Sequence, residues 1–199
     1  MGRQMRHETW AKTRNGHRIH IFGPAGSGTS TLGRALANAL ATQHFDCDDF
    51  YWLPTDPAFQ VKRPVPDRLA LMEQVFVPRR DWILSGSMEG WGRSIAPRIT
   101  LGIRLTLDRE HRRVRLERRE ALRCDCGRGW GQPFCTPCTA FLCWADGYEQ
   151  GDRPGRSLKR DLRWAKELDC PVLDLDSRRP AAELVQITLD RLQQISVLT

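Results

Sequence analysis

A glycine-rich segment near the N-terminus constrains this chain of 199 residues more than any other feature. It reads Gly-Pro-Ala-Gly-Ser-Gly-Thr-Ser from residue 23 to residue 30, between the apolar run 18–22 and a helical pattern over 29–42. A strand, such a turn and a helix are the setting in which G-x-x-x-x-G-K-[ST] encloses a phosphate, with backbone N–H groups turned inward. The helix start adds partial positive charge. We therefore expect an anion site formed by Gly23, Gly26, Ser27, Gly28, Thr29, Ser30 and Thr31.

The segment departs from this pattern at one position, because Thr29 stands where the pattern has a lysine. Ser30 keeps the hydroxyl that contacts Mg²⁺ in such loops, but no lysine occurs between Lys12 and Lys62. Three interpretations follow: a site that turns over with an arginine supplying the missing charge, a site that binds without catalysis, or a turn that binds nothing. The spacing, the flanking elements and Ser30 favour the first two.

Short apolar runs alternate with helical patterns along the chain, which is typical of a parallel sheet built from strand–helix–strand units. Strands are expected at residues 18–22, 44–48, 82–84, 99–107 and 171–175. Helices are expected at residues 29–42, 67–77, 108–123, 139–148, 157–168 and 181–198, with Asp67 and Asp108 as N-caps. Right-handed crossovers then give a three-layer α/β domain with a five-stranded parallel sheet. We expect this domain over residues 17–199, after a flexible tail over residues 1–16.

Composition excludes several classes of protein. Hydrophobic residues make up 40% and charged residues 28% of the chain, which excludes a disordered or low-complexity protein. No apolar stretch of about 18 residues is present, and the N-terminus lacks the apolar core of a secretory signal, so we expect a cytoplasmic protein without a membrane partner. The net charge is +7, and all but four of the 31 basic residues are arginines. This balance favours anionic partners: nucleotides, other phosphates or nucleic acid.

Two aspartates close the second expected strand. Asp46 and Asp48 are two residues apart, so strand alternation would place both carboxylates on one side. Ligands of doubly wound folds bind at the carboxyl ends of strands, so we expect both near the glycine-rich loop. The third strand ends in Ser85-Gly86-Ser87, without the metal-binding aspartate that many phosphate-binding loops have nearby. The alternative is a solvated turn in which the acids cap a loop.

The segment from Arg104 to Arg128 contains nine arginines, these two included. Arg112, Arg115 and Arg119 recur at i, i+3 and i+7, so they line one face of the expected helix. Guanidinium groups match the charge that spreads over a transferring phosphoryl group, so a substitute for the missing lysine is expected here. The glutamates of the same helix favour the alternative of an exposed helix crossed by salt bridges.

Five of the seven cysteines lie close together. Cys124, Cys126, Cys135 and Cys138 form C-x-C followed by C-x-x-C, which suits a tetrahedral, structural Zn²⁺ site. Cys143 is an alternative ligand. Disulfides or free thiols are the alternative to a metal.

The loop and the segments after it resemble the adenylate kinase-like branch of P-loop nucleotide and small-molecule kinases. They resemble more narrowly a group of uncharacterised bacterial P-loop proteins whose loop reads Gly-Ser-Gly-Thr-Ser-Thr-Leu, without the lysine. The further matching segments are residues 46–52, 54–57, 62–63, 84–87 and 90–92. The resemblance covers about residues 18–176. It implies a P-loop NTPase fold, an ATP site on the loop, an acceptor site over the second and third strands, and a lid at about residues 109–150.

The resemblance also implies roles for the candidate residues. Shikimate kinase-like enzymes carry a similar Asp-x-Asp, which implies that Asp46 assists Mg²⁺ and that Asp48 orients or deprotonates the acceptor. Nucleotide kinases close lid arginines over the phosphoryl group, which implies this role for Arg112, Arg115 and Arg119. Some adenylate kinases carry a four-cysteine zinc site in the lid.

Together these observations predict a kinase that uses ATP and Mg²⁺ on a nucleotide or small-molecule acceptor. The alternative is a nucleotide-binding regulator, or a nucleic-acid-associated protein, that has lost turnover. No helix-turn-helix, RNA-binding or zinc-finger recognition pattern supports nucleic acid as a partner.

Overall fold

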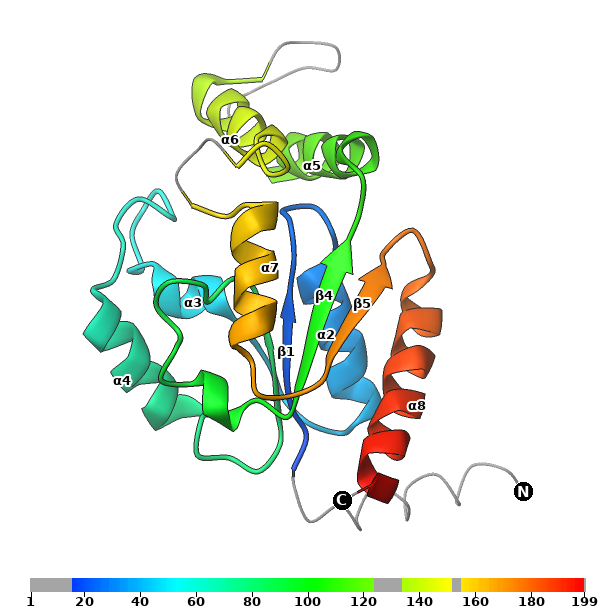
Figure 1. The fold of residues 1–199 in the computed structure, drawn as a ribbon. Coiled ribbons are helices and arrows are strands. Elements are labelled where there is room, and N and C mark those ends of the chain that lie inside the picture. The colour runs from blue at the N-terminus through cyan, green and yellow to red at the C-terminus, as the bar shows by residue number, and fades with distance from the viewer. Residues whose placement is uncertain (1–15, 124–133, 152–154, 199) are drawn as a thin grey trace.

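The computed structural model describes residues 16–123, 134–151 and 155–198. Five parallel strands form one sheet in the order β2-β3-β1-β4-β5 (Figure 1). The strands are β1 (Arg18–Phe22), β2 (His44–Asp46), β3 (Trp82–Ser85), β4 (Leu101–Thr106) and β5 (Val172–Asp176). Each predicted strand is present, and the predicted α/β fold class with its five-stranded parallel sheet is confirmed.

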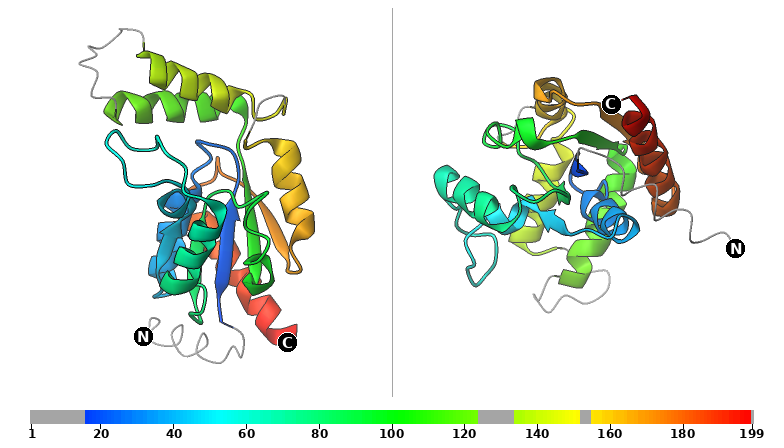
Figure 2. Two further views of the ribbon diagram at one scale, coloured as in Figure 1. Left: turned by 90° about the vertical axis from the view of Figure 1, so that its left-hand side faces the viewer. Right: turned by 90° about the horizontal axis from the view of Figure 1, so that it is seen from below.

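Helices cover both faces of the sheet. They are α2 (Thr29–Ala39), α3 (Cys47–Tyr51), α4 (Val65–Val75), the short 3₁₀ helix η1 (Ala96–Arg98), α5 (Arg109–Arg123), α6 (Thr136–Asp146), α7 (Leu158–Glu167) and α8 (Ala181–Leu198). Helices α2 and α8 pack together over one face, and α4 and α7 cover the other (Figure 2). None of the helices described is long and apolar enough to cross a membrane.

The core follows from the alternation of side chains along buried strands. In β1, Ile19 and Ile21 pack with α2 and α8, whereas Phe22 packs on the opposite face with Trp164 of α7. Because both faces are covered, the strands are apolar along most of their length, as is usual in parallel sheets. Four of the strands end in a polar residue at their carboxyl ends: Asp46, Ser85, Thr106 and Asp176.

Helices α5 and α6 lie side by side beyond the carboxyl ends of the strands (Figures 1 and 2). A small apolar cluster of Leu116, Leu142 and Ala145 joins these two helices, and Ala25 of the glycine-rich loop packs against it. The two helices thus rest directly on the loop.

One predicted boundary at the second strand is wrong, and it bears on the site. The strand ends at Asp46, and Asp48 lies in helix α3. Asp46 caps this helix, since its Oδ1 accepts a hydrogen bond of 3.1 Å from the backbone N–H of Asp48. Strand alternation therefore does not set the direction of the two carboxylates.

Other helix boundaries also differ from the predictions. Helix α2 ends before Thr42 because Ala41 adopts a left-handed conformation with φ 50°. Helix α4 begins after Pro64, so Asp67 lies in its first turn and does not cap it. Helix α6 begins at Thr136, three residues before the predicted start. The predicted tail lies outside the described residues except for Gly16.

Candidate functional site

The glycine-rich loop has the backbone that an anion site requires. Gly26 and Gly28 adopt φ values of 83° and 91°, which favour glycine. A side chain on Gly26 would also stand 3.1 Å from the backbone oxygen of Arg112. Among the described residues no side chain caps α2, and its first turn holds no acidic residue. The opening N–H groups of this helix, from Thr29 onward, are therefore free of side-chain caps and suit a phosphate.

Three polar side chains from three elements meet beside this helix start. The hydroxyl of Ser30 donates a hydrogen bond of 2.6 Å to Oδ2 of Asp46, at the end of β2. The hydroxyl of Ser85, at the end of β3, donates to the same oxygen at 3.1 Å and lies 3.4 Å from Ser30 Oγ. One carboxylate and two hydroxyls form an all-oxygen group, and oxygen ligands are those that Mg²⁺ takes. These residues therefore fit Mg²⁺ bound together with phosphate oxygens.

His44 contacts this cluster through Ser85. Its Nε2 lies 2.9 Å from Ser85 Oγ. Because the Ser85 hydroxyl donates to Asp46, this nitrogen must carry the proton and donate to Ser85. Burial lowers the pKa of His44, which keeps the imidazole neutral. The sequence noted only the lack of an acid at the end of β3, and the structure places Ser85 there as a partner of Asp46.

Asp48 is the second carboxylate at this edge. It is exposed to solvent, yet enough protein surrounds it for desolvation to raise its pKa above the usual 3.8. The positive charges of Arg156 and Arg119 oppose this rise, whereas Asp46 and Asp49 add to it. A carboxylate with a raised pKa that faces cations is a candidate for accepting a proton.

Arg156 was missed by the sequence analysis. It lies in the segment before α7, and its charge acts on Asp48, on Asp161 and on the buried Tyr148. It stands two residues before the start of α7 and outside the predicted arginine-rich helix, so no periodic pattern marked it.

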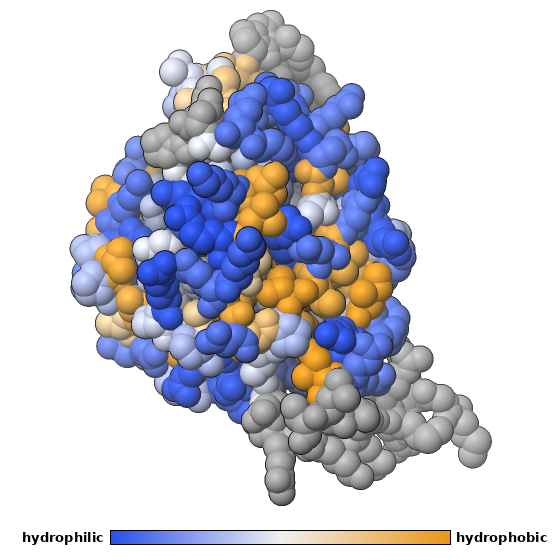
Figure 3. All heavy atoms as spheres, viewed as in Figure 1, coloured by the Kyte–Doolittle hydropathy of each residue, from blue (hydrophilic) through white to orange (hydrophobic). Residues whose placement is uncertain are grey.

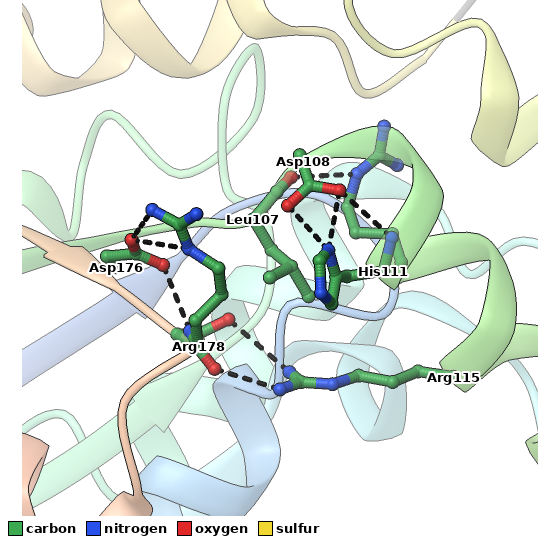
Figure 4. Close-up of polar contacts among 8 residues, drawn as sticks. Leu107, Asp108, His111, Arg115, Asp176 and Arg178 are labelled. Carbon is green, nitrogen blue, oxygen red and sulfur yellow. Dashed lines mark hydrogen bonds and ion pairs between the residues drawn. The ribbon is translucent and has the colours of Figure 1, made fainter.

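Of the arginines predicted to serve the lid, Arg115 extends toward the glycine-rich loop. Its Nη2 donates to the backbone oxygen of Ser177 at 2.9 Å, and its Nη1 lies 3.4 Å from the Ser177 hydroxyl (Figure 4). The same Nη1 is 3.8 Å from the position that a Cβ on Gly28 would take. Arg115 therefore spans from α5 to the segment after β5, directly over the start of α2.

Arg112 has a different environment from the one predicted. Its side chain is only 1% exposed, and its guanidinium points toward α6. Nη1 donates to the backbone oxygen of Ala145 at 3.0 Å, Nη2 forms an ion pair with Glu149 at 2.5 Å, and Nε donates to the backbone oxygen of Leu107 at 3.2 Å. These contacts hold α5 to α6, and the structure does not bring this guanidinium to the loop.

Arg119 has a third environment, different from those of Arg115 and Arg112. It forms an ion pair with Glu120 at 3.1 Å, and its guanidinium lies 5.0 Å from the ring centre of Phe141 in α6. Its charge also opposes the rise in the pKa of Asp48 that desolvation causes. The three arginines that share one helical face thus have three different sets of partners.

A cavity of about 330 Å³ lies beside the loop, at the carboxyl ends of β4 and β5. Its walls include Pro24, Arg104, Thr106 and Tyr148. Arg178 binds the carboxylate of Asp176 at one side of it and holds the pKa of Asp176 at about 2 (Figure 4).

At another side of this cavity Asp108 begins α5 as predicted. It accepts a hydrogen bond of 3.0 Å from the backbone N–H of His111, and its carboxylate lies 2.8 Å from Nδ1 of the same residue (Figure 4). The charged groups of Asp108 and Asp176 that border this cavity therefore already have partners within the chain.

An aromatic cluster lies around the carboxyl end of α3. Tyr51 packs edge-on against Trp52 and Trp91, and the guanidinium of Arg68 lies 3.7 Å from the Tyr51 ring centre. Trp52 also packs edge-on against Phe59. These rings contact one another, but Tyr51, Trp52 and Trp91 are only partly buried and Phe59 is exposed. Asp48 lies at the other end of this short helix, in its first turn.

The predicted zinc site is only partly described. Cys135 precedes α6 and Cys138 is buried in its first turn, but Cys124 and Cys126 lie outside the described residues. Within the described ranges no group of three or more His, Cys, Asp or Glu residues is placed to hold a metal ion. The four-cysteine site therefore stays a prediction.

Comparison with known sequences places the chain in a family. No protein-family profile matches it. It is 36% identical over 174 residues to YqaC of Bacillus subtilis (strain 168), a protein described as uncharacterized, and the match covers 87% of this chain and 96% of YqaC. The chain belongs to the YqaC family.

Solved structures share the fold of this YqaC family member at low sequence identity. The shikimate kinase from Acinetobacter baumannii in complex with shikimate has a TM-score of 0.57 and 15% identity, over 94% of this chain and 97% of that one. A gluconokinase from Sinorhizobium meliloti 1021 has a TM-score of 0.52 and 19% identity, over 92% and 95% of the two chains. These likenesses confirm the predicted P-loop NTPase fold. The narrower adenylate kinase-like branch stays a prediction.

Proposed function

We propose that this YqaC family member binds ATP with Mg²⁺ and transfers the γ-phosphoryl group to a hydroxyl of a nucleotide or small-molecule acceptor. The observation that carries the proposal is the meeting of Ser30, Asp46 and Ser85 beside the uncapped start of α2. An anion cradle and an all-oxygen cation site lie side by side there, which is the combination that a magnesium-bound phosphate chain needs.

The roles of the carboxylates follow from their environments. Asp46 and Ser30 would hold Mg²⁺, which when bound offsets the charge of the phosphate chain. Asp46 already accepts two hydroxyl hydrogen bonds, so its carboxylate is held in place. Asp48 makes no such contact with Ser30 or Ser85 and is exposed, so it can meet an incoming hydroxyl and accept its proton.

Arginines would supply the charge that the loop lacks. A guanidinium nitrogen of Arg115 lies 3.8 Å from the Cβ position of Gly28, and neither Arg112 nor Arg119 comes within 4 Å of that position. Arg156 and Arg119 act on the acceptor side, where their charges reach Asp48. Arg112 would serve indirectly, by holding α5 against α6.

A panel of compounds is needed to identify the class of the phosphoryl acceptor. The fold neighbours include kinases named for shikimate and for gluconate. The panel therefore contains these two acids, the nucleoside monophosphates and small alcohols, each tested for acceptor-dependent ATP consumption.

The experiment compares the wild type with Asp48→Asn and with the matched control Asp49→Asn. Asp49 is the exposed neighbour on α3 and has no hydroxyl partner in the cluster. We expect turnover with one acceptor class, its loss in Asp48→Asn and its retention in Asp49→Asn. Magnesium nucleotide binding without turnover on any acceptor would contradict the kinase and favour the regulator. In that case Thr29→Lys tests whether the missing lysine is the reason.

We also propose that Zn²⁺ stabilises the predicted lid through Cys124, Cys126, Cys135 and Cys138. Support comes from their spacing and from the position of Cys135 and Cys138 at the start of α6. We expect about one zinc per chain by elemental analysis, as four thiolates hold one ion. A ratio near zero in protein purified without chelator would remove the metal.

A further inference from the structure

His20 occupies the middle of the central strand β1 as a fully buried polar residue. Its Nε2 lies 2.9 Å from the backbone oxygen of Gly86, just after β3. Its Nδ1 lies 3.0 Å from the indole Nε1 of Trp164, in α7. One imidazole therefore connects three elements that are far apart in the sequence.

The two contacts fix the tautomer of the ring. An indole N–H only donates, so Nδ1 of His20 must accept from Trp164. A neutral imidazole that accepts at Nδ1 carries its proton on Nε2, which therefore donates to the oxygen of Gly86. Burial lowers the pKa of His20 to about 4, in agreement with a neutral ring.

Both backbone polar groups of Gly86 form hydrogen bonds with residues of β1. Its N–H donates to the backbone oxygen of Ile21 at 2.9 Å, and its own oxygen accepts from His20. Gly86 has φ 111°, and a Cβ there would stand 2.7 Å from Cβ of Cys47 in α3. Its place in the chain is next to Ser85, whose hydroxyl donates to Asp46.

The third element, α7, is also attached to the site. Trp164 is buried, whereas the outer face of α7 is mostly hydrophilic, with Leu162 as an exposed apolar residue (Figure 3). On that face Arg160 and Arg163 form ion pairs with Glu89 at 3.3 Å and 3.5 Å, close after Gly86 in sequence. The segment before α7 carries Arg156.

We propose that His20 is a positioning residue that fixes the Gly86 carbonyl and thereby holds Ser85 against Asp46 and Ser30. A leucine or phenylalanine would fill the same volume but would leave the Gly86 oxygen and the Trp164 N–H without this buried partner. The proposal rests on the proposed function to the extent that the Ser30–Asp46–Ser85 cluster binds Mg·ATP.

Two substitutions separate the two hydrogen bonds. The amide nitrogen of glutamine reaches the place of an imidazole Nε2, so His20→Gln can keep the bond to Gly86. The amide oxygen of asparagine reaches the place of Nδ1, so His20→Asn can keep the bond from Trp164 and loses the one to Gly86. Both variants are polar and smaller than the native ring. Asparagine is one methylene shorter than glutamine and leaves the larger cavity, so the stability of each variant is measured beside its affinity.

The test first measures the thermal unfolding midpoint of both variants. Mg·ATP binding is then measured by calorimetry at a temperature below the lower of the two midpoints, where both variants are folded. We expect His20→Gln to bind close to the wild type and His20→Asn to bind about tenfold more weakly, as for outer-shell partners of metal sites. Equal affinities in the two variants, or a loss that follows the thermal midpoint in both, would overturn the proposal.

Two further measurements test the positioning role of His20 without depending on Mg·ATP binding. In the wild type, ¹⁵N NMR of His20 is expected to show the Nε2–H tautomer, and amide exchange at Gly86 and Ser87 is expected to rise in His20→Asn but not in His20→Gln. If the wild type binds no Mg·ATP, the proposed function fails, and these readouts still decide the positioning role. The other tautomer, or equal exchange in both variants, would contradict it.

Discussion

The hydroxyl of Ser30 donates a hydrogen bond of 2.6 Å to Asp46, and this contact joins the start of α2 to the end of β2. The first residue belongs to the glycine-rich loop and its helix, and the second belongs to the Asp-x-Asp segment. The two motifs that the sequence singled out separately therefore form one site. Asp46 also caps α3, so the same side chain sets the helix that carries Asp48.

Replacement of Asp46 by asparagine tests the proposed cation site. The negative charge is lost, and if the amide oxygen keeps the bond from the Asp48 N–H, the amide nitrogen faces Ser30 and can neither accept its hydrogen bond nor bind a cation. We therefore expect Mg²⁺-dependent ATP affinity to fall by about 10- to 100-fold. ATP affinity without Mg²⁺ is expected to change much less. Calorimetry with and without Mg²⁺ measures both, with Asp49→Asn as control. An equal loss in both conditions would mean that the substitution disturbs the loop and not a cation site.

Replacement of Asp48 by asparagine tests the proposed role of Asp48 as proton acceptor. We expect kcat to fall by about 10²- to 10⁴-fold, the range for general bases, with nucleotide affinity unchanged. Because the pKa of Asp48 is raised above 3.8, the wild-type kcat/KM is expected to fall as the pH drops through that raised value and the carboxylate is protonated. A pH profile with the same acid limb in Asp48→Asn would assign that limb to another group.

The contact between Arg112 and Glu149 is expected to stabilise the packing of α5 against α6. Glu149→Ala leaves a guanidinium that is 1% exposed without its anionic partner, so we expect a loss of about 2 kcal/mol in the free energy of unfolding. Glu117→Ala removes the half-exposed ion pair with Arg113 and is expected to lose at most about 1 kcal/mol. Urea unfolding of both variants measures the difference. Equal losses would show that the buried contact does not dominate.

The buried imidazole of His20 predicts a pH dependence of stability. Its pKa is about 4 in the folded chain and 6.5 when exposed, so only the unfolded chain takes up a proton between these values. The free energy of unfolding should therefore fall by about 3 kcal/mol from pH 6.5 to pH 4, since one pKa unit corresponds to about 1.4 kcal/mol. His20→Gln removes this contribution and should show a flatter profile in urea titrations. Parallel profiles would contradict a neutral His20.

The strands and the loop could be predicted because local patterns specify them. Apolar runs bounded by turn residues mark β1 and β3, and the glycines of the loop are needed at positive φ. The position of Asp48 could not be predicted in this way. Strand alternation applies only while the strand continues, and whether Asp46 extends β2 or caps α3 depends on the neighbouring β3 and on Ser30.

The partners of the three arginines of α5 also could not be predicted from the local sequence pattern. Spacing places Arg112, Arg115 and Arg119 on one face, but α6 packs on this face and buries Leu116 one turn after Arg112. The packing of α6 on α5 then decides which guanidinium reaches the loop, and this packing cannot be read from local sequence patterns. Arg156 and His20 gave no signal, because one lies in an irregular segment and the other is a single polar residue in a strand.

Calorimetric titration of purified protein with Mg·ATP tests the central claim most directly, namely that this loop encloses a phosphate chain without its lysine. The account predicts saturable binding at about one site per chain, weaker in Asp46→Asn and tighter in Thr29→Lys. No saturable heat for the wild type at any Mg·ATP concentration, with Thr29→Lys equally silent, would contradict it.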